Sequence, residues 1–316
     1  MNHLTRIIYF GTAEFAVPAL RALLERPESY EVAAVVSQPD RPAGRRGELK
    51  PSPVAALARS ADLKLLQPEK LDQAAIDVLR DLSADLFIVA AYGQILPQTV
   101  LDLPPHGTLN LHGSLLPKYR GASPIQTAIR DGEPETGVTL MLMDRKMDHG
   151  PLLASAIETI RPDDDYLGLS ERLADDAADL LIQNLPGYLA GELKPNEQDH
   201  EAATFTKILK KEDGRIDWTA DSAVEVERRV RAYRPWPGTF FDWTDRKGQT
   251  LTVKLLRAEL ANAEDSSGKI GELRTGSRGS PLVTCADGRT LRLLEVQPAG
   301  KKPLAGPDFS RGFLKS

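Results

Sequence analysis

The first 190 residues alternate between two hydrophobic periods, and this alternation restricts the chain to one class of fold. Residues 7–10 form a short continuous apolar run that is closed by Gly11 and Thr12, and apolar residues then recur at helical spacing up to Leu24. Such a run followed by such a spacing predicts a buried strand, a turn and a helix. The same pattern predicts strands at 32–36, 86–90 and 108–112, and helices at 53–61 and 123–130. We therefore expect an α/β fold with an open, mostly parallel, Rossmann-like sheet flanked by helices.

The predicted sheet continues with strands at 137–143 and 152–160, and a long helix at 167–189 closes it. From residue 191 to 204 the composition becomes polar, which is typical of a linker. Beyond it we expect a helix at 222–233 and short strands at 239–243, 250–257, 282–285 and 290–296. Short strands with glycine-rich turns favour a small β-barrel of the OB-like type. The sequence thus predicts a first domain over 1–190, a linker over 191–205 and a C-terminal β-barrel domain over 206–316.

A parallel sheet of this kind often binds a dinucleotide, but the first turn argues against it. The turn at residues 11–15 lacks the second and third glycines of the G-x-G-x-x-G motif. Without those glycines the main chain cannot approach a pyrophosphate closely. We therefore do not expect NAD binding.

The chain is long enough for two hydrophobic cores and carries one cysteine. With 316 residues, of which 41% are apolar, it can bury one large core and a second, smaller one. Cys285 cannot form an intramolecular disulfide, and no cluster of Cys and His has metal-ligand spacing, so we expect a reducing compartment and no metal. The N-terminus has no signal or transit pattern, and no apolar run approaches the length that spans a bilayer. These features predict a cytoplasmic protein with no membrane partner.

Charge is distributed unevenly along the chain. The formal net charge is −5, yet residues 1–204 hold 19 Lys and Arg against 30 Asp and Glu, whereas residues 205–316 hold 21 against 15. A basic C-terminal part on an otherwise acidic protein is typical of a protein that binds a polyanion there. The alternative is solvated charge that is scattered unevenly over the surface.

The residues that suggest chemistry gather at the end of the strand predicted at 108–112. Asn110 and His112 are two positions apart, so their side chains point to the same side of the sheet. An amide donor and an imidazole therefore converge where open α/β sheets place their ligands. The alternative is that both are hydrogen-bonded core residues, but the polar loop that follows His112 favours a site.

Two motifs carry a resemblance to a known family. Residues 110–117 resemble the N-x-H-x-S-L-L-P signature of the folate-dependent formyltransferases. Residues 143–150 resemble the second signature of that family, M-D-x-G-x-D-x-G, which supplies a catalytic aspartate; by this match it is Asp148. The sequence departs from the second signature at Lys146, where the family has its first glycine, but it retains Asp148 and Gly150.

Further segments narrow the resemblance to the methionyl-tRNA formyltransferases. Residues 38–45 and 51–54 resemble the loop after the second strand of these enzymes, and residues 207–208, 211–218 and 231–238 resemble the entry to their C-terminal domain. The resemblance covers nearly the whole chain. It implies transfer of the formyl group from 10-formyltetrahydrofolate to the methionine amino group of initiator methionyl-tRNA, in support of translation initiation. It also implies a catalytic first domain and a tRNA-binding C-terminal domain, and we expect a monomer.

This reaction suits the residue types at the predicted site. Formyl transfer passes through a tetrahedral intermediate with negative charge on the former carbonyl oxygen, and it requires neither a metal nor a covalent intermediate. Asn110 and His112 can donate hydrogen bonds to that oxygen. Asp148 can orient His112 and help carry the proton from the attacking amine to the departing folate nitrogen. Sequence leaves open which of His112 and Asp148 moves the proton.

The resemblance places tetrahydrofolate against two walls. An apolar wall with free main-chain groups suits a flat pterin with polar edges. One wall is the loop after the catalytic strand, with Ser114, Leu115, Leu116 and Pro117. The other is the end of the neighbouring strand, with Ile88, Ala90, Tyr92 and Gly93. Ile88 is explained equally well as ordinary core.

Two basic segments are candidates for contact with tRNA. Residues 38–51 form a long connection, and a loop of this length inside a compact domain is usually functional or disordered. Arginine can present a planar fork to a phosphate or a base edge. The candidates in this loop are Arg41, Arg45 and Arg46, and those near the start of the C-terminal domain are Lys207, Lys210 and Lys211. A merely solvated basic loop is the alternative.

Three other functions remain to be separated from this one. A formyltransferase for a small amine, such as an amino-sugar nucleotide, would share Asn110, His112 and Asp148 but would not need the basic loop or the C-terminal domain. A formyltetrahydrofolate hydrolase would use water in place of the amine. An RNA-binding module without activity would use the β-barrel alone, and the complete set of three candidate catalytic residues argues against it.

Overall fold

The computed structural model describes residues 4–43, 48–245, 248–262, 265 and 268–314 of the chain. These residues fold into two compact units. The first unit takes in the chain up to Pro124, together with Glu135–Thr159 and Ser170–Thr206. The second takes in Ile125–Pro134, Ile160–Leu169 and the chain from Lys207 onward.

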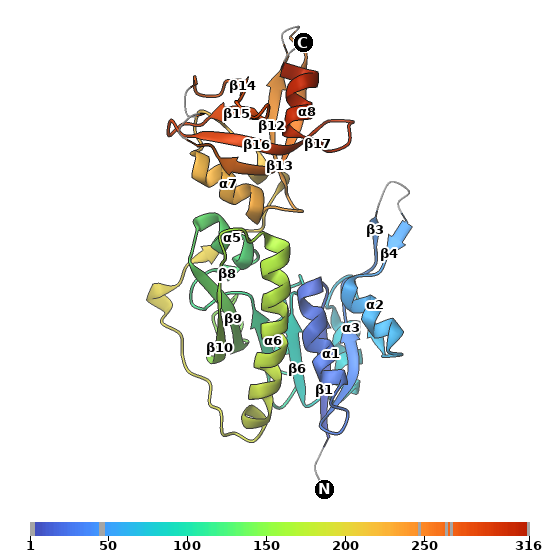
Figure 1. The fold of residues 1–316 in the computed structure, drawn as a ribbon. Coiled ribbons are helices and arrows are strands. Elements are labelled where there is room, and N and C mark those ends of the chain that lie inside the picture. Colours follow the sequence, from blue (N-terminus) through green and yellow to red (C-terminus); the bar gives the residue numbers. More distant parts are fainter. Residues whose placement is uncertain (1–3, 44–47, 246–247, 263–264, 266–267, 315–316) are drawn as a thin grey trace. The chain divides into compact units, whose positions relative to one another are not determined.

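A seven-stranded sheet forms the centre of the first unit (Figure 1). Its order is β10-β9-β7-β6-β1-β2-β5. The strands from β7 to β5 are parallel, whereas β9 and β10 run antiparallel at one edge. The expected open, mostly parallel α/β sheet is thus confirmed. The strands are β1 Thr5–Gly11, β2 Tyr30–Val36, β5 Leu65–Leu66, β6 Leu86–Ala90, β7 Thr108–His112, β9 Glu135–Leu142 and β10 Leu152–Thr159.

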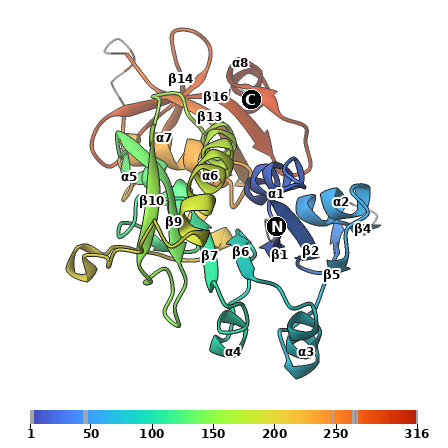
Figure 2. The same ribbon diagram turned by 90° about the horizontal axis from the view of Figure 1, so that it is seen from below.

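Helices cover both faces of this sheet. Figure 2 shows α1 and α6 on one face and α3 and α4 on the other. Ser52 begins α2 by accepting from the N–H of Ala55 at 3.1 Å, and Asp72 begins α3 by accepting from the N–H of Ala75 at 3.1 Å. Each cap satisfies a main-chain donor that the first helical turn leaves without a partner. The helices are α1 Val17–Leu24, α2 Pro53–Ser60, α3 Gln73–Asp81, α4 Gln98–Leu101, α5 Pro124–Asp131 and α6 Tyr166–Leu189.

The central strand β1 buries side chains on both of its faces. Phe10 packs under α3 and α4, where its ring centroid lies 5.2 Å from that of Phe87 and 5.5 Å from that of Tyr92. Tyr9 points to the opposite face, where its hydroxyl donates to the carbonyl oxygen of Ala16 at 2.6 Å. Because both faces are covered, the strand is apolar at successive positions, and this is why the sequence shows an unbroken run there.

The second unit is built on an antiparallel sheet with the order β12-β13-β16-β15-β14, to which β17 is added beside β16. The sheet curls into a half-barrel (Figure 1), and the pairing of β13 with β16 is irregular around Arg257, as expected where a sheet bends. The expected C-terminal β-domain is therefore confirmed in this curled form. The strands are β12 Thr239–Thr244, β13 Thr250–Leu260, β14 Leu273–Thr275, β15 Pro281–Thr284, β16 Thr290–Pro298 and β17 Leu304–Ala305.

Helices support this curled sheet at two places. Helix α7, Ala223–Ala232, begins with a capping box in which Ser222 and Glu225 satisfy each other's main-chain N–H groups. Near the C-terminus, α8 (Gly306–Phe309) and the π-helical turn η5 (Ser310–Leu314) carry Phe309 and Phe313. Their rings stack at 4.8 Å, and Trp243 of β12 packs against both at about 6 Å. This aromatic group joins the C-terminal turn to the core of the half-barrel.

Several short elements differ from what the sequence predicts. The connection at 38–51 is not an uninterrupted loop, because Arg41–Ala43 (β3) pairs antiparallel with Glu48–Lys50 (β4) as a hairpin. Strands of three residues are too short to show a hydrophobic period. Helix α3 is also absent from the sequence prediction. Its helical hydrophobic period is weak, because Ile76 and Leu79 are the only apolar residues that it buries.

The polar segment predicted as a linker runs along the first unit up to Thr206. Asn196 and Leu152 exchange main-chain hydrogen bonds of 2.7 and 2.8 Å. Farther on, Phe205–Thr206 (β11) pairs with Arg120–Gly121 (β8) as a short parallel ladder. The segment therefore has the polar composition of a linker but forms specific hydrogen bonds with the first unit.

Two glycines allow a matched test of close packing. A β-carbon at Gly137 in β9 would lie 2.0 Å from the carbonyl oxygen of Ala156, so Gly137→Ala is expected to lower the free energy of unfolding by about 1–3 kcal/mol. A β-carbon at Gly168 in α6 would meet nothing nearer than 3.8 Å, so Gly168→Ala should raise it by roughly 0.5–1 kcal/mol. Denaturant unfolding of both variants measures the difference. A change of the same sign in the free energy of unfolding of both variants would contradict the packing described here.

Candidate active site

Asn110 and His112 occupy the carboxyl-terminal half of β7, which lies between β6 and β9. Both residues are buried, with 8% and 6% of their surface exposed. The side-chain amide of Asn110 forms no hydrogen bond with the described part of the chain, and its atoms are not completely closed off from solvent. Its donor and acceptor are therefore available to a ligand.

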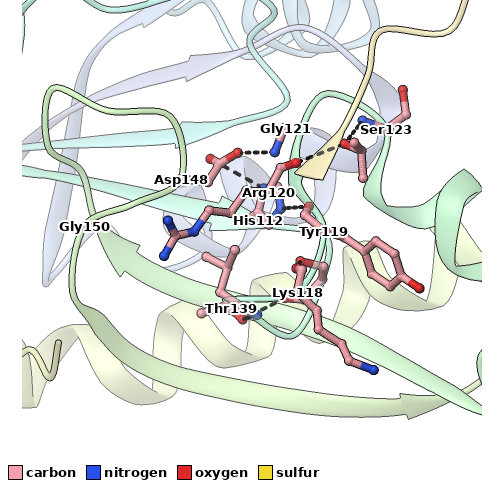
Figure 3. Close-up of polar contacts among 12 residues, drawn as sticks. His112, Lys118, Tyr119, Arg120, Gly121, Ser123, Thr139, Asp148 and Gly150 are labelled. Carbon is pink, nitrogen blue, oxygen red and sulfur yellow. Dashed lines mark hydrogen bonds and ion pairs between the residues drawn. The ribbon is translucent and has the colours of Figure 1, made fainter. Parts of the chain in front are cut away.

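His112 lies between two oxygen atoms. Its Nε2 is 3.0 Å from the carbonyl oxygen of Tyr119, and its Nδ1 is 3.6 Å from Oδ1 of Asp148. A carbonyl oxygen can only accept, so Nε2 carries a proton. The other ring nitrogen, Nδ1, faces Asp148 (Figure 3).

Asp148 is held by its carboxylate and by its main chain. The N–H of Gly121 donates to Oδ2 of Asp148 at 2.7 Å, and Figure 3 shows this contact beside His112. The residue has a φ of +48°, a left-handed conformation that aspartate tolerates better than most residues. Its carbonyl oxygen accepts from Nε2 of Gln198 at 3.0 Å. The turn between β9 and β10 thus brings the candidate aspartate back to the end of β7.

Lys146 does not disturb this turn. It is not among the described residues with positive φ, so its position does not require the glycine that the family signature has there. Its side chain is exposed, and its N–H donates to Oδ1 of Asp144 at 2.8 Å. The same aspartate contacts Nδ1 of His149 through Oδ2 at 2.6 Å. The loop therefore closes on Asp144.

The loop that follows His112 is braced from within. The hydroxyl of Ser114 donates to the carbonyl oxygen of Lys118 at 2.6 Å. Thr139 of β9 donates to the carbonyl oxygen of Ser114 at 2.7 Å and accepts from the N–H of Leu116 at 3.1 Å. Ser114 and Leu116 are buried, so their side chains support the loop, whereas Leu115 and Pro117 are partly exposed.

The second predicted folate wall has only one exposed member. Ile88 and Ala90 are fully buried in the sheet, and Tyr92 packs its ring against Phe10 in the core. Burial raises the pKa of Tyr92 to about 12, and its hydroxyl forms no hydrogen bond with any residue that the structure describes. Gly93 is exposed and has a φ of +84°. At this wall the main chain around Gly93 is the part that a ligand can reach.

The β3–β4 hairpin is fixed at its base. Asp40 accepts from Nε2 of Gln67 at 2.7 Å and from Nη2 of Arg59 at 2.9 Å, and these bonds lower the pKa of Asp40. Arg41 lies in β3 with its side chain exposed. The other two candidate arginines of this segment, Arg45 and Arg46, lie outside the described residues.

The three candidate lysines belong to the second unit and are all exposed. Nζ of Lys207 forms an ion pair of 2.5 Å with Asp213, which lowers the pKa of that carboxyl. Lys210 precedes the 3-10 turn η3 (Lys211–Gly214), and its charge also helps to lower the pKa of Asp213. Asp213 therefore neutralises Lys207 directly and Lys210 in part, whereas Lys211 forms no ion pair with the described residues.

The described parts of the chain contain neither a membrane-spanning helix nor a cluster of metal ligands. No helix there combines the length and apolarity needed to cross a membrane. No group of three or more His, Cys, Asp and Glu side chains there is arranged to hold a metal ion.

The structure adds residues that the sequence analysis missed. Arg120, Gly121 and Gln198 all contact the Asp148 turn or each other. Gln198 comes from a segment that reads as a linker, and no local pattern marks it. Gly121 closely follows the first signature, so proximity to that motif was the one available signal.

The sequence pattern of the formyl transferase family matches residues 5–185, and that of the formyl transferase C-terminal domain matches residues 208–314. A methionyl-tRNA formyltransferase from Chloroflexus aurantiacus is 45% identical over 308 residues, which cover 97% of this chain and 96% of that protein. The methionyl-tRNA formyltransferase from Geobacter sulfurreducens is 45% identical over 311 residues, covering 98% and 94%. The chain belongs to the methionyl-tRNA formyltransferase family.

Solved structures share the fold of this family member at low sequence identity. An N-formyltransferase from Helicobacter canadensis, in complex with folinic acid and dTDP-3-aminofucose, has a TM-score of 0.65 at 18% identity and covers 94% of this chain and 100% of its own. HypX from Aquifex aeolicus, in complex with tetrahydrofolic acid, has a TM-score of 0.64 at 20% identity. This chain is covered to 99% by that match but spans only 48% of HypX. At these identities the likeness concerns the fold alone.

Proposed function

We propose that this chain transfers the formyl group of 10-formyltetrahydrofolate to the amino group of methionine on initiator tRNA, and so supports translation initiation. The observation that carries the proposal is the 45% identity over 97% of the chain, which spans both units. The convergence of Asn110, His112 and Asp148 supports it. We further propose that the enzyme acts as a monomer in the cytoplasm, where charged tRNA and folates meet.

In this proposal Asn110 stabilises the tetrahedral intermediate. Attack of the amine on the formyl carbon places negative charge on the former carbonyl oxygen. The amide of Asn110 has no competing partner in the described chain, so it can donate to that oxygen without first breaking another hydrogen bond. A donor of this kind is typically worth roughly 3 kcal/mol in the transition state.

His112 is the group that we propose moves the proton. Its Nε2–H is committed to the carbonyl oxygen of Tyr119, which leaves Nδ1 to take a proton from the attacking amine. The imidazolium that forms lies 3.6 Å from the carboxylate of Asp148, and the opposite charge favours it. The same proton then passes to the departing folate nitrogen, so the ring returns to its neutral form. Asp148 orients and stabilises the ring.

The folate is proposed to lie against the loop after β7 and the turn after β6. Leu115, Pro117 and Gly93 are the members of the two predicted walls that reach the surface. Ser114, Leu116 and Tyr92 support them from behind. A pterin would therefore meet partly exposed apolar groups and main-chain atoms, which suits its flat shape and polar edges.

Contact with tRNA is proposed to be divided between the two units. The segment 38–51, whose sequence contains Arg41, Arg45 and Arg46, follows a strand of the catalytic sheet, and we propose that it contacts the end of the acceptor arm. The basic residues of the 206–316 part would attract phosphates regardless of sequence.

Competing acceptors test the proposed function directly. The wild-type protein is given 10-formyltetrahydrofolate with initiator Met-tRNA, elongator Met-tRNA, free methionine or an amino-sugar nucleotide. We expect turnover with initiator Met-tRNA far above that with the other acceptors. Preferred turnover with the amino sugar, or release of tetrahydrofolate without any acceptor, would replace the proposal by one of its two enzymatic alternatives.

Alanine substitutions test the catalytic residues. Asn110→Ala, His112→Ala and Asp148→Ala are each expected to lower kcat by on the order of 10²-fold or more, because each group acts in the transition state. The Kd for tRNA should change little. His106→Ala, at an exposed histidine of the same unit, is the control and should be fully active. Normal turnover in any of the three variants would remove that residue from the mechanism.

Salt dependence tests the lysines of the second unit. Lys210→Ala and Lys211→Ala should weaken initiator and elongator tRNA alike and each reduce the slope of log Kd against log salt by about 1. Lys207→Ala should have a smaller effect, because Asp213 already neutralises that ammonium group. Filter binding over a range of salt concentrations measures all three. A change in the preference between the two tRNAs would contradict a role limited to phosphates.

A further inference from the structure

We propose that Gln198 is a positioning residue for Asp148 and that Arg120 holds Gln198 in place. The inference rests on the function and on the role of Asp148 proposed above, and it adds a residue from the segment after α6. Gln198 and Arg120 act through the turn that carries Asp148 and do not touch the reacting atoms.

Gln198 binds the main chain on both sides of His149. The residue is 6% exposed, and its Nε2 donates to the carbonyl oxygen of Asp148 at 3.0 Å and to that of Gly150 at 2.7 Å. Both amide hydrogens are thereby used. Both carbonyls belong to the turn in which Asp148 has its φ of +48°. The amide therefore fixes the orientation of that turn.

Arg120 fixes the other end of the same amide. Its Nη2 and Nε donate to Oε1 of Gln198 at 2.6 and 3.2 Å, and Nη2 also lies 2.9 Å from Nδ1 of His200. A guanidinium can only donate, so it directs Oε1 of Gln198 toward itself and Nε2 toward the turn. The charge of Arg120 also polarises the amide and strengthens its donation to the two carbonyls.

The choice of a neutral amide at this position has a physical reason. Arg120 is 3% exposed, and no carboxylate in the described ranges is within ion-pair distance of it. A carboxylate at position 198 would satisfy the guanidinium but would set negative charge against two carbonyl oxygens. Glutamine is a residue of this length that accepts from the arginine and donates to the turn at once.

Asp148 is therefore held twice from the same short strand, β8. The N–H of Gly121 binds its carboxylate at 2.7 Å (Figure 3), and Arg120 binds its main chain through Gln198. A left-handed conformation persists where its surroundings over-determine it. Without Gln198 the carboxylate contact alone would have to maintain the 3.6 Å approach of Asp148 to His112.

Gln198→Glu is the decisive substitution. It keeps the side-chain length and the acceptor for Arg120 but removes both amide hydrogens. We expect kcat to fall by about 30- to 100-fold, since a displacement of about 1 Å at a reacting group can cost on the order of 10²-fold. KM for both substrates should stay unchanged, because the substrate contacts remain. Gln198→Met removes the same bonds without adding charge and should show the same loss, which gives a second measurement if the first variant does not fold.

Asn184→Asp is the matched control. Nδ2 of Asn184 donates to the carbonyl oxygen of Leu180 at 2.7 Å within α6. The same exchange of an amide for a carboxylate against a carbonyl is thus made in the same unit and away from Asp148. We expect normal kcat here, with melting temperatures recorded for every variant.

A double-mutant cycle shows whether Gln198 acts through Asp148. In an Asp148→Asn background, Gln198→Glu should lower the single-turnover rate by less than about threefold further, because the residue it positions no longer functions. The full loss in both backgrounds, or normal kcat in both Gln198 variants, would overturn the inference. Wild-type protein assayed in parallel separates the two proposals: an inactive wild type contradicts the function, whereas an active wild type with active variants contradicts only the role of Gln198.

Discussion

The hydrogen bond from the N–H of Gly121 to the carboxylate of Asp148 is the contact on which the site depends. It joins the loop after β7 to the turn between β9 and β10, two segments that pairing of the sheet alone does not bring together. With that bond in place, Asp148 faces Nδ1 of His112, whose other nitrogen is already committed to Tyr119. The contact of Nε2 with Tyr119 leaves Nδ1 as the nitrogen that faces the carboxylate.

The candidate catalytic residues around this contact stand on two kinds of element, a buried strand and a turn. Asn110 and His112 stand on a strand that is buried on both faces, so their main chain has little freedom. Asp148 stands on a turn, and a turn must be held by partners from elsewhere. The main-chain and side-chain donors of β8 supply them, together with Gln198. A precise site on a loop thus depends on buried hydrogen bonds that are satisfied at both ends.

The charged side chains divide in a similar way into those that stabilise the fold and those that are available to a ligand. The base of the β3–β4 hairpin, which carries Arg41, is fixed by hydrogen bonds from Arg59 and Gln67 to Asp40. In the second unit, Lys207 forms an ion pair with Asp213 and Lys210 lies close enough to lower the pKa of the same carboxyl, whereas Lys211 forms no ion pair with the described residues. Basic side chains of one sequence pattern therefore divide into those that stabilise the fold and those available to a polyanion.

The sequence by itself determined the fold class and the candidates for chemistry. Unbroken apolar runs mark strands that are buried on both faces, and the spacing of Asn110 and His112 puts them on one side of a strand. The tertiary structure alone decided that Tyr92 packs against Phe10 in the core, and that Gln198 binds carbonyls about 50 positions earlier. The hydrophobic period of a helix or strand indicates only on which face of that element a residue lies. Partners that are distant along the chain leave no such period, so only the folded chain brings Gln198, Arg120 and Asp148 together.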